Sequence, residues 1–245
     1  MTAPVAEIFS SLAGEGPHVG RRQIFLRLAG CPVGCDYCDT PTDPQAPAEI
    51  ERRPGEVVRL ANPLTVEAVL TEIRGLEDRA PGHAHLALTG GEPLLYGKFL
   101  RELLPLVRET GLPIYLETAG VLPDALPPLL PFFDVVAADI KLPHHCGRAY
   151  WDESRRFLAI CAGAGVELLV KVIFGLKTPW DEVERALRLV NGVAPEVEVT
   201  LQPIHGADGR PELAGEEMLR AHIRASALHR NLRVLPQVHR LVGIK

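Results

Sequence analysis

Apolar runs rich in β-branched residues alternate along this chain with segments of helical pattern. Seven runs predict β-strands, at residues 24–29, 86–89, 114–118, 135–140, 166–174, 197–203 and 233–235. Five segments predict helices, at residues 66–77, 98–110, 152–164, 180–191 and 216–229. This alternation is typical of βαβ units around a parallel sheet. Six such units are too few to close an eight-fold barrel, so we expect an α/β fold with an open, partial (β/α)6 TIM-like barrel.

The distinctive residues of the chain come directly after the predicted strands. The first strand is followed by a cysteine loop at residues 31–38, and later strands by Gly90-Gly-Glu-Pro93, Ala119-Gly120 and Lys141-Leu-Pro143. The carboxyl ends of parallel strands meet at one edge, where barrel enzymes carry their active sites. We therefore expect the active site there. Residues 40–54 contain four prolines, which fit neither a helix interior nor a central strand, and predict an ordered or mobile loop beside the site.

Composition narrows the possible partners. The chain has 245 residues, 47% of them hydrophobic, and a net charge of −5, so we expect no broad basic face and no tight nucleic-acid binding. No apolar run reaches the roughly 18 residues that span a bilayer, and the first residues do not read as a signal peptide. Five cysteines, three of them clustered, do not suggest a disulfide framework. We expect a protein of the reducing cytoplasm that binds no membrane.

Three cysteines, Cys31, Cys35 and Cys38, have the spacing C-x3-C-x2-C. Three thiolates on one loop can hold three irons of a [4Fe-4S] cluster and leave the fourth iron open for a ligand that is not protein. A structural zinc site would need a fourth protein ligand, and Cys146 and Cys161 lie more than a hundred residues away with no knuckle spacing. The spacing resembles the signature of the radical S-adenosylmethionine (SAM) enzymes. In that superfamily SAM chelates the open iron, and one electron from the cluster cleaves it to a 5′-deoxyadenosyl radical.

The segment Thr89-Gly-Gly-Glu-Pro93 is the second strong signal. Glycines allow a backbone to approach a ligand closely, and a carboxylate such as that of Glu92 can pair with an ammonium group. The segment resembles the GGE motif of radical SAM enzymes, which holds the amino group of SAM. A Gly-Gly pair alone usually indicates only a turn. When it follows a C-x3-C-x2-C loop, it is far more specific for a radical SAM enzyme.

Further motifs narrow the family. Ser11-Leu-Ala-Gly-Glu-Gly16, Phe25-Leu-Arg-Leu-Ala-Gly-Cys31, Tyr37-Cys-Asp-Thr40 and Leu235-Pro-Gln-Val-His239 closely resemble the 7-carboxy-7-deazaguanine synthase family, nearly end to end. The resemblance implies a radical SAM lyase that converts 6-carboxy-5,6,7,8-tetrahydropterin to 7-carboxy-7-deazaguanine with loss of ammonia, in queuosine and 7-deazapurine biosynthesis. Its cofactors would be a [4Fe-4S] cluster, SAM and Mg2+. The resemblance also implies one domain over residues 1–245, with a substrate-binding segment at 5–30 and a tail at 231–245 that completes the site.

The same resemblance assigns roles to single residues. The catalytic residues would be the three cluster cysteines and Glu117, and Thr40 would bind Mg2+ through its hydroxyl. The residues expected at SAM are Tyr37, Cys38, Asp39, Gly91, Glu92, Asp139, Ile140, Lys141 and Gln202. The residues expected at the pterin are Leu12, Ala13, Gly14, Arg27, Thr89, Glu117, His239 and Lys245.

Plainer interpretations stay open for several of these side chains. Arg27 has the alternative of a solvent-exposed strand residue, Glu117 of a structural ion pair, His239 of a surface histidine and Thr40 of a loop hydroxyl. Ala13 stands where the family often has glutamine, so only backbone contacts remain there, and Lys245 ends a chain that in some members ends in proline. No role matches His144, His145, Cys146 or Cys161, which are expected to be structural or surface residues.

Two other functions compete with this hypothesis. A glycyl-radical-enzyme activating enzyme shares the cysteine spacing and the GGEP segment, but should lack the motifs at residues 11–16 and 235–239. A non-catalytic metal-binding scaffold would hold zinc without iron or sulfide. The expected partners are the small pterin substrate, an electron donor such as flavodoxin, and a second copy of the chain in a homodimer.

Overall fold

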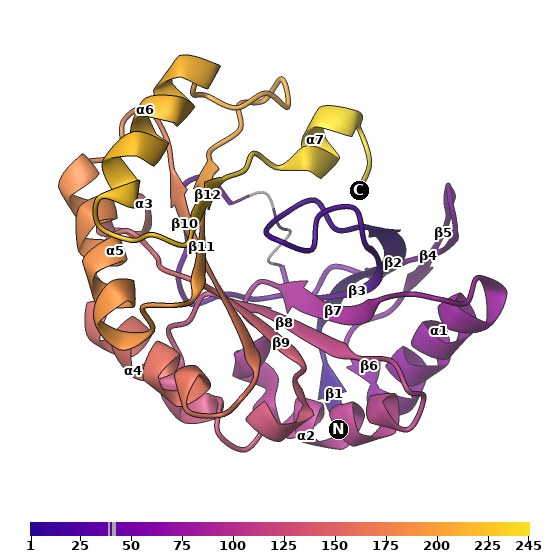
Figure 1. The fold of residues 1–245 in the computed structure, drawn as a ribbon. Helices are drawn as coiled ribbons and strands as arrows, with labels where there is room; N and C mark the ends of the chain where they lie inside the picture. Colours follow the sequence, from indigo (N-terminus) through magenta and orange to yellow (C-terminus); the bar gives the residue numbers. More distant parts are fainter. Residues whose placement is uncertain (39, 41–42) are drawn as a thin grey trace.

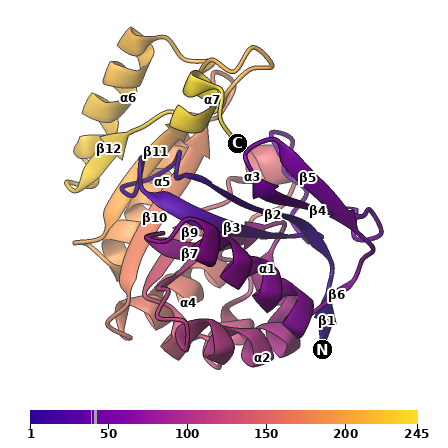
Figure 2. The same ribbon diagram turned by 90° about the vertical axis from the view of Figure 1, so that its right-hand side faces the viewer.

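A curved sheet of ten strands organises the molecule, and helices cover its outer face (Figures 1 and 2). The computed structural model describes residues 1–38, 40 and 43–245. The strands lie in the order β12-β11-β10-β9-β8-β7-β3-β2-β4-β5, and the seven from β12 to β3 run parallel. They do not close on themselves, so the predicted open barrel is confirmed.

The seven predicted strands are all present, with ends shifted by at most two residues. They are β3 (Arg22–Leu28), β7 (His85–Gly90), β8 (Ile114–Thr118), β9 (Val135–Asp139), β10 (Glu167–Phe174), β11 (Glu198–Pro203) and β12 (Leu232–Val234). Most of their side chains are buried, as expected for parallel strands that are covered on both faces.

The other strands were not predicted. They are β1 (Thr2–Ala3), β2 (Val5–Leu12), β4 (Ala48–Arg53), β5 (Glu56–Leu60) and β6 (Leu64–Thr65). Strand β2 runs antiparallel to β3 and extends the sheet, and β4 and β5 form a hairpin at its edge. The expectation of a loop throughout residues 40–54 was therefore wrong for its second half. Pro47 directly precedes β4 and Pro54 lies in the turn after it, so the prolines bracket this strand without interrupting it.

Five longer helices connect the parallel strands on the outside of the sheet: α1 (Val66–Arg79), α2 (Gly97–Arg108), α4 (Trp151–Ala162), α5 (Trp180–Val193) and α6 (Gly215–Ser226). All five were predicted. The crossover from β8 to β9 instead uses two short 3-10 turns. Two short helices were missed, α3 (Pro143–Cys146) and α7 (Val238–Val242). None of the described helices is both long and apolar enough to cross a membrane.

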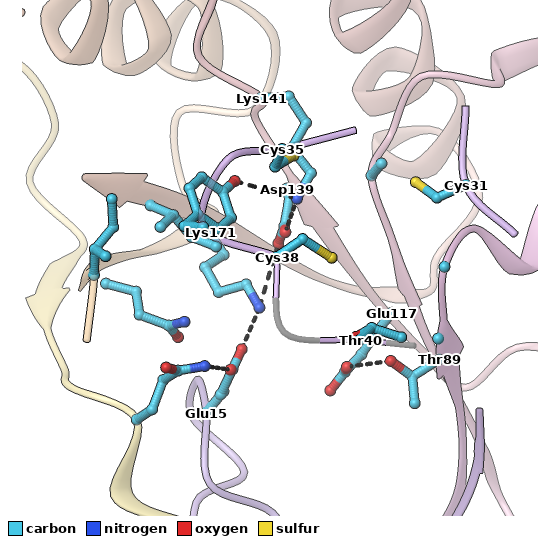
Figure 3. A pocket seen from close by; sticks show the side chains of 18 of the residues that line it. Glu15, Cys31, Cys35, Cys38, Thr40, Thr89, Glu117, Asp139, Lys141 and Lys171 are labelled. Atoms are coloured by element: carbon cyan, nitrogen blue, oxygen red, sulfur yellow. Dashed lines mark hydrogen bonds and ion pairs between the residues drawn. The ribbon is translucent and has the colours of Figure 1, made fainter. Parts of the chain in front are cut away.

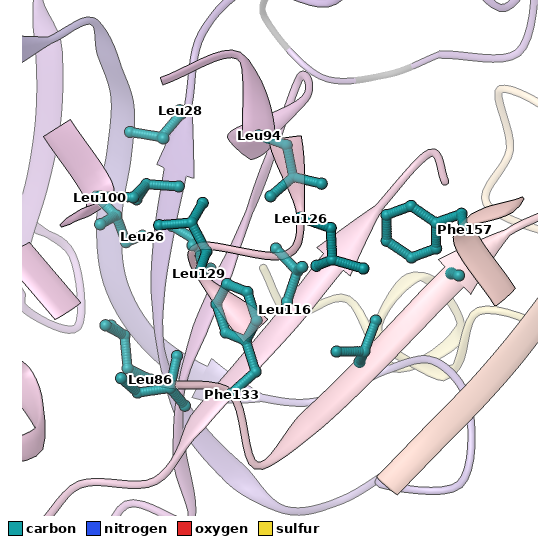
Figure 4. Close-up of a cluster of buried hydrophobic side chains, with 14 of the residues drawn as sticks. Leu26, Leu28, Leu86, Leu94, Leu100, Leu116, Leu126, Leu129, Phe133 and Phe157 are labelled. Carbon is teal, nitrogen blue, oxygen red and sulfur yellow. The ribbon is translucent and has the colours of Figure 1, made fainter. Parts of the chain in front are cut away.

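The main core lies between the outer face of the sheet and these helices (Figure 4). Leu86 and Leu116 of neighbouring strands and Leu100 of α2 belong to this cluster, and all three side chains are fully buried. Burial of a leucine side chain contributes about 1.5–3 kcal/mol. This layer fixes the strands to which the site residues are attached.

The loop between β2 and β3 fills the inner side of the barrel. His18 in this loop contacts the rings of His85 and Tyr115, at centroid distances of 5.0 and 5.3 Å, and lies 3.0 Å from the carboxylate of Glu167. These partners lie at the amino ends of β7, β8 and β10. The barrel is therefore packed at its amino end and open at its carboxyl end.

Candidate active site

A cavity of about 410 Å³ opens at the carboxyl ends of the parallel strands, where the site was expected (Figure 3). Many of the predicted site residues line this cavity: Arg27, Cys31, Cys35, Tyr37, Cys38, Thr40, Thr89, Gly91, Glu117, Asp139, Lys141 and Gln202. Seven predicted residues do not line it: Leu12, Ala13, Gly14, Glu92, Ile140, His239 and Lys245. Asp39 lies outside the described residues.

The cysteine loop leaves the end of β3 and returns toward the cavity. Gly30 and Gly34 adopt φ values of +85° and +70°, which favour glycine and allow the sharp turns on either side of Cys31. Cys31 and Cys35 pack against a small apolar cluster that contains Val33, whereas Cys38 is exposed. All three thiols border the same cavity. A donor set of three sulfurs on one loop fits a [4Fe-4S] cluster with one iron that lacks a protein ligand.

The thiols of this loop differ in acidity. A hydrogen bond from Cys146 lowers the pKa of Cys35 to about 6, against the effect of burial and with help from the charge of Lys141. Burial raises the pKa of Cys31, despite hydrogen bonds from backbone amides. Because thiolates are the form that binds metal, the lowered pKa of Cys35 favours its metal-binding form, whereas the raised pKa of Cys31 favours the thiol.

The glycines after β7 are required by the neighbouring strand rather than by a ligand alone. A Cβ on Gly90 would lie 2.1 Å from the carbonyl oxygen of Leu28, and one on Gly91 would lie 1.9 Å from that of Gly30. These distances are far below van der Waals contact. The two glycines bring the end of β7 against the start of the cysteine loop, and both also line the cavity.

Glu92 serves this turn as a buried structural carboxylate. Its side chain is 0% exposed and accepts hydrogen bonds from the Leu94 and Ala119 amides and the Thr118 hydroxyl, at 2.7–3.0 Å. Burial raises its pKa, despite these donors. The expectation that this carboxylate pairs with an ammonium of SAM is therefore corrected: it ties the end of β7 to the end of β8.

A chain of opposite charges crosses the cavity wall (Figure 3). Asp139 at the end of β9 lies 2.8 Å from the Lys141 ammonium and 3.5 Å from that of Lys171 on β10. Lys171 also forms an ion pair with Glu15. The carboxylates raise the pKa of both lysines well above the usual value, although burial opposes this. Two cations thus remain charged at the position where we expect SAM.

Glu15 was not predicted as a site residue, although it belongs to the motif at residues 11–16. Burial raises its pKa, but the charge of Lys171 and a 2.5 Å hydrogen bond from Gln237 lower it to about 2. Glu15 is therefore an anion that joins the β2–β3 loop to β10 and to the C-terminal segment.

Arg27 and Thr40 lie together at the other side of the cavity. The Arg27 guanidinium donates to the carboxylate of Glu7 at 3.0 Å and to the Thr40 hydroxyl at 3.2 Å. It is only partly exposed, with 24% of its side chain accessible. The structure thus contradicts the alternative of a strand arginine with its head in solvent. A positive group and a hydroxyl oxygen face one part of the cavity.

Thr89 and Glu117 form the floor between Arg27 and the lysines. The Thr89 hydroxyl donates to the Glu117 carboxylate at 2.8 Å. Burial raises the pKa of Glu117, and the charge of Lys171 offsets this only in part. Glu117 has no ion-pair partner within contact distance among the described residues, so a carboxyl group with spare hydrogen-bonding capacity faces the cavity.

The N-terminal motif and the tail contact each other beside the cavity. The Val238 amide donates to the Gly14 carbonyl at 2.9 Å, and the His239 ring covers Gly14 so closely that a Cβ there would lie 2.1 Å from its Nδ1. Lys245 lies 2.5 Å from the Glu7 carboxylate, and its carbonyl accepts from Ser11. These contacts join β2, the β2–β3 loop and the C-terminal tail into a wall beside the cavity. Gly14, His239 and Lys245, which were predicted to touch the pterin, belong to this wall and do not line the cavity.

Among the cavity residues that were not predicted are five with charged or long polar side chains: Glu15, Lys171, His205, Gln237 and Arg240. Four of these had a signal in the sequence. Glu15 and Gln237 belong to the motifs at residues 11–16 and 235–239, Lys171 is a cation within the predicted strand 166–174, and His205 follows a strand end. His205 is buried, its Nδ1 lies 3.1 Å from the Pro203 carbonyl, and its Nε2 has no partner among the described residues. An unpartnered donor or acceptor at a cavity wall is suited to a bound ligand.

Comparisons with known proteins agree with this geometry. The family model described as the radical SAM superfamily matches residues 26–190. A 7-carboxy-7-deazaguanine synthase from Geobacter sulfurreducens is 37% identical over 246 residues, which cover 98% of this chain and 97% of the relative. Another 7-carboxy-7-deazaguanine synthase, from Methanopyrus kandleri, is 38% identical over 97% of this chain and 92% of the relative.

Solved structures share the fold. The crystal structure of QueE from Escherichia coli superimposes with a TM-score of 0.65 at 22% identity and covers 98% of this chain and 95% of that one. Streptococcus suis SuiB bound to S-adenosylmethionine superimposes with a TM-score of 0.58 at 11% identity, over 84% of this chain and 48% of that one. At these identities the likeness concerns the arrangement of strands and helices.

Proposed function

The chain belongs to the radical SAM superfamily and, within it, to the 7-carboxy-7-deazaguanine synthases, and on this premise we infer that it is the radical SAM lyase of a 7-deazapurine pathway. Its reaction is the conversion of 6-carboxy-5,6,7,8-tetrahydropterin to 7-carboxy-7-deazaguanine with loss of ammonia. The relatives match it over nearly their whole length and carry this name, whereas a glycyl-radical activating enzyme or a scaffold is not among the functions that they support.

We propose that Cys31, Cys35 and Cys38 hold the [4Fe-4S] cluster and that SAM binds beside it. When bound, these two groups supply the one-electron chemistry that starts the reaction. The protein contributes position and charge. Lys141 and Lys171, held by Asp139, place positive charge at the cavity wall. The remaining proposed SAM contacts are the backbone at Gly91 and the side chains of Tyr37 and Gln202, which also line the cavity.

We propose that the pterin lies between Arg27, Thr89 and Glu117. Arg27 offers a planar donor to the substrate carboxylate. Glu117, whose pKa burial raises, faces the N–H groups of the ring, and Thr89 fixes its orientation. The wall formed by residues 12–14 and the tail closes this side, with His239 over Gly14. Orientation of this kind reduces the entropic barrier to a reaction between two bound molecules.

We further propose that Thr40 binds Mg2+ through its hydroxyl oxygen. The oxygen now accepts a hydrogen bond from Arg27, so it lies beside the group that would bind the substrate carboxylate. Mg2+ prefers oxygen ligands and keeps several waters, and one protein ligand plus substrate oxygens is a common arrangement. Held by Thr40, the ion would supply positive charge beside Arg27, where we propose that the substrate carboxylate binds.

The observation that carries this function is that three thiols, Arg27 and Glu117 border one cavity. The test is anaerobic incubation of the iron-reconstituted protein with SAM, reductant, Mg2+ and 6-carboxy-5,6,7,8-tetrahydropterin, followed by mass spectrometry. We expect 7-carboxy-7-deazaguanine from the wild type and none from Cys31→Ala. Reconstituted protein with about four irons per chain that consumes no pterin under these conditions would contradict the proposal.

We also propose what else the family resemblance implies. The chain forms a single domain, assembles as a homodimer, accepts electrons from a donor such as flavodoxin and acts in the cytoplasm. Sedimentation of the reconstituted protein tests the dimer. Replacement of the chemical reductant by reduced flavodoxin tests the electron donor. If turnover still requires the chemical reductant, flavodoxin is not the donor.

A further inference from the structure

Cys146 lies against a cysteine that the proposed function uses, although no role was predicted for it. Its Sγ is 3.4 Å from the Sγ of Cys35, which is 111 positions away in the sequence. Both side chains are half-buried and pack on the cluster of Val33, Val121 and Tyr150. The reaction outlined above requires neither this contact nor a thiol at position 146.

Protein groups alone hold the two thiols together. The Asp36 amide donates to the His145 carbonyl at 3.0 Å, and the His145 ring lies 2.9 Å from the Asp36 carboxylate and 2.7 Å from the Thr178 hydroxyl. The turn of α3 ends at Gly147, whose φ is +66°. These contacts involve no iron. Cys146 therefore stays beside Cys35 in a chain that has not received its cluster or has lost it.

We propose that Cys146 is a reserve partner for Cys35, with which it forms a reversible disulfide in the cluster-free protein. The oxidant is a low-molecular-weight disulfide such as oxidised glutathione. One protein thiolate attacks it and releases one reduced glutathione; the other protein thiolate then attacks the mixed disulfide and releases the second. Two thiols lose two protons and two electrons, and one glutathione disulfide becomes two thiols. The functional meaning of this pair rests on the proposed role of Cys35 as a cluster ligand.

The geometry favours this pair over its competitors. A disulfide bond is about 2.05 Å long, so a contact of 3.4 Å requires only a small side-chain movement. An intramolecular partner also acts at a much higher effective concentration than free glutathione. A thiol held as a disulfide is protected from irreversible oxidation and returns on reduction. Cys35 would then remain available for a new cluster after oxidative loss of the first.

The test uses the metal-free full chain, reduced anaerobically and then equilibrated with graded ratios of oxidised to reduced glutathione. Free thiols are alkylated, and disulfides are mapped by mass spectrometry of a non-reducing digest. We expect the Cys35–Cys146 link to appear at the lowest oxidising ratio and to disappear with dithiothreitol. Cys146→Ser should shift oxidation to glutathione adducts or to a Cys35–Cys38 link. Cys161→Ser is the matched control, since Cys161 is buried in the main core, and it should leave the map unchanged.

A second measurement follows recovery. Metal-free protein receives a pulse of peroxide and then dithiothreitol, and iron uptake is counted on reconstitution. Wild type and Cys161→Ser should recover most of their iron, and Cys146→Ser several-fold less. The proposal would be overturned if Cys35 were found oxidised while Cys146 still reacted freely with the alkylating reagent. Failure of the proposed function is distinct, because it appears as missing product from loaded wild-type enzyme, whereas Cys146→Ser loaded without oxidation should retain activity.

Discussion

Two carboxylates of the cavity have opposite charge preferences because their neighbours differ. Lys171 forms an ion pair with Glu15, and this pair overcomes burial and keeps the pKa of Glu15 at about 2. Glu117 is partly buried beside Thr89 and forms no ion pair with any described residue, and burial raises its pKa. Pairs of titratable groups with opposed shifts divide roles in an active site. Glu15 anchors the wall as an anion, and Glu117 is the group suited to exchange hydrogen bonds with a substrate.

Arg27 provides the first prediction at this scale. Arg27→Ala removes a charge-assisted donor, so pterin binding should weaken by at least about tenfold, equivalent to about 1.4 kcal/mol. SAM binding should change by less than about twofold, because the SAM contacts that we propose lie elsewhere. Calorimetric titration of each ligand measures both. Arg59→Ala is the matched control, since Arg59 pairs with Glu49 on the surface. Equal weakening of both ligands by Arg27→Ala would indicate a structural arginine.

Thr40 provides the second prediction at the scale of single residues. Thr40→Ala removes one oxygen ligand, so turnover should fall by about tenfold or more and its dependence on Mg2+ concentration should flatten. Thr40→Ser keeps the oxygen and should retain most of the activity. Product formation over a Mg2+ titration measures this, with iron content as the control for an intact cluster. A Thr40→Ala enzyme with unchanged Mg2+ dependence would remove Thr40 from the metal site.

At the scale of elements, short α3 is expected to position the cysteine loop. His145→Ala removes its bonds to Asp36 and Thr178. The variant should lose iron several-fold faster to a chelator and show a raised KM for SAM, with little change in kcat. Loss of iron to the chelator is followed by absorbance. His144 is exposed and provides the matched control, and His144→Ala should behave as wild type. A His145→Ala protein of lower melting temperature but normal iron retention would make His145 merely structural.

The loop between β2 and β3 gives a pH-dependent prediction. The folded-state pKa of Glu15 is depressed from 4.5 to about 2. Its ion pair therefore stabilises the fold above the unfolded value, and this contribution is lost as pH falls from about 4.5 toward 2. At pH 7, Glu15→Gln should lower the free energy of unfolding by about 3 kcal/mol, at about 1.4 kcal/mol per pKa unit. Urea unfolding of the metal-free protein at several pH values measures this. A difference between wild type and variant that stays constant down to pH 2 would contradict the assignment.

Elements with continuous apolar runs were predictable from the sequence, and those with mixed burial were not. The run at 166–174 predicted β10 because both faces of a parallel strand are covered. Strand β2 was missed because half-buried polar residues interrupt its pattern, and β4 because the prolines around it suggested a loop. The side chain of Glu92 was assigned to a ligand because its motif lies at the site. Only the structure reveals that Thr118 and two amides already satisfy it.

At the scale of the whole molecule, the cavity is built from distant parts of the chain. The loop after β3 provides the thiols, and the ends of β8 and β9 provide Glu117 and Asp139. Their common edge follows from the parallel direction of the strands, which the sequence predicted. The closing wall combines the β2–β3 loop with the C-terminal segment, more than 200 residues apart. No local pattern predicts such a contact. The resemblance of both motifs to one family pointed to a shared role, and the Glu15–Gln237 bond supplies its physical form.

This construction predicts that the tail can be separated from the barrel. A chain that ends at Gln237 keeps every parallel strand and the main core but loses the Val238–Gly14, Ser11–Lys245 and Glu7–Lys245 contacts. We expect its melting temperature to fall by only a few degrees, because exposed contacts contribute about 1 kcal/mol or less each. Pterin binding should weaken by at least about tenfold, since Arg240 leaves the cavity wall. SAM binding and iron content should persist, because the tail provides neither the three thiols nor Asp139. Thermal unfolding, iron analysis and titration with both ligands measure these effects. A truncated chain that binds pterin as well as wild type would show that the barrel alone forms the substrate site.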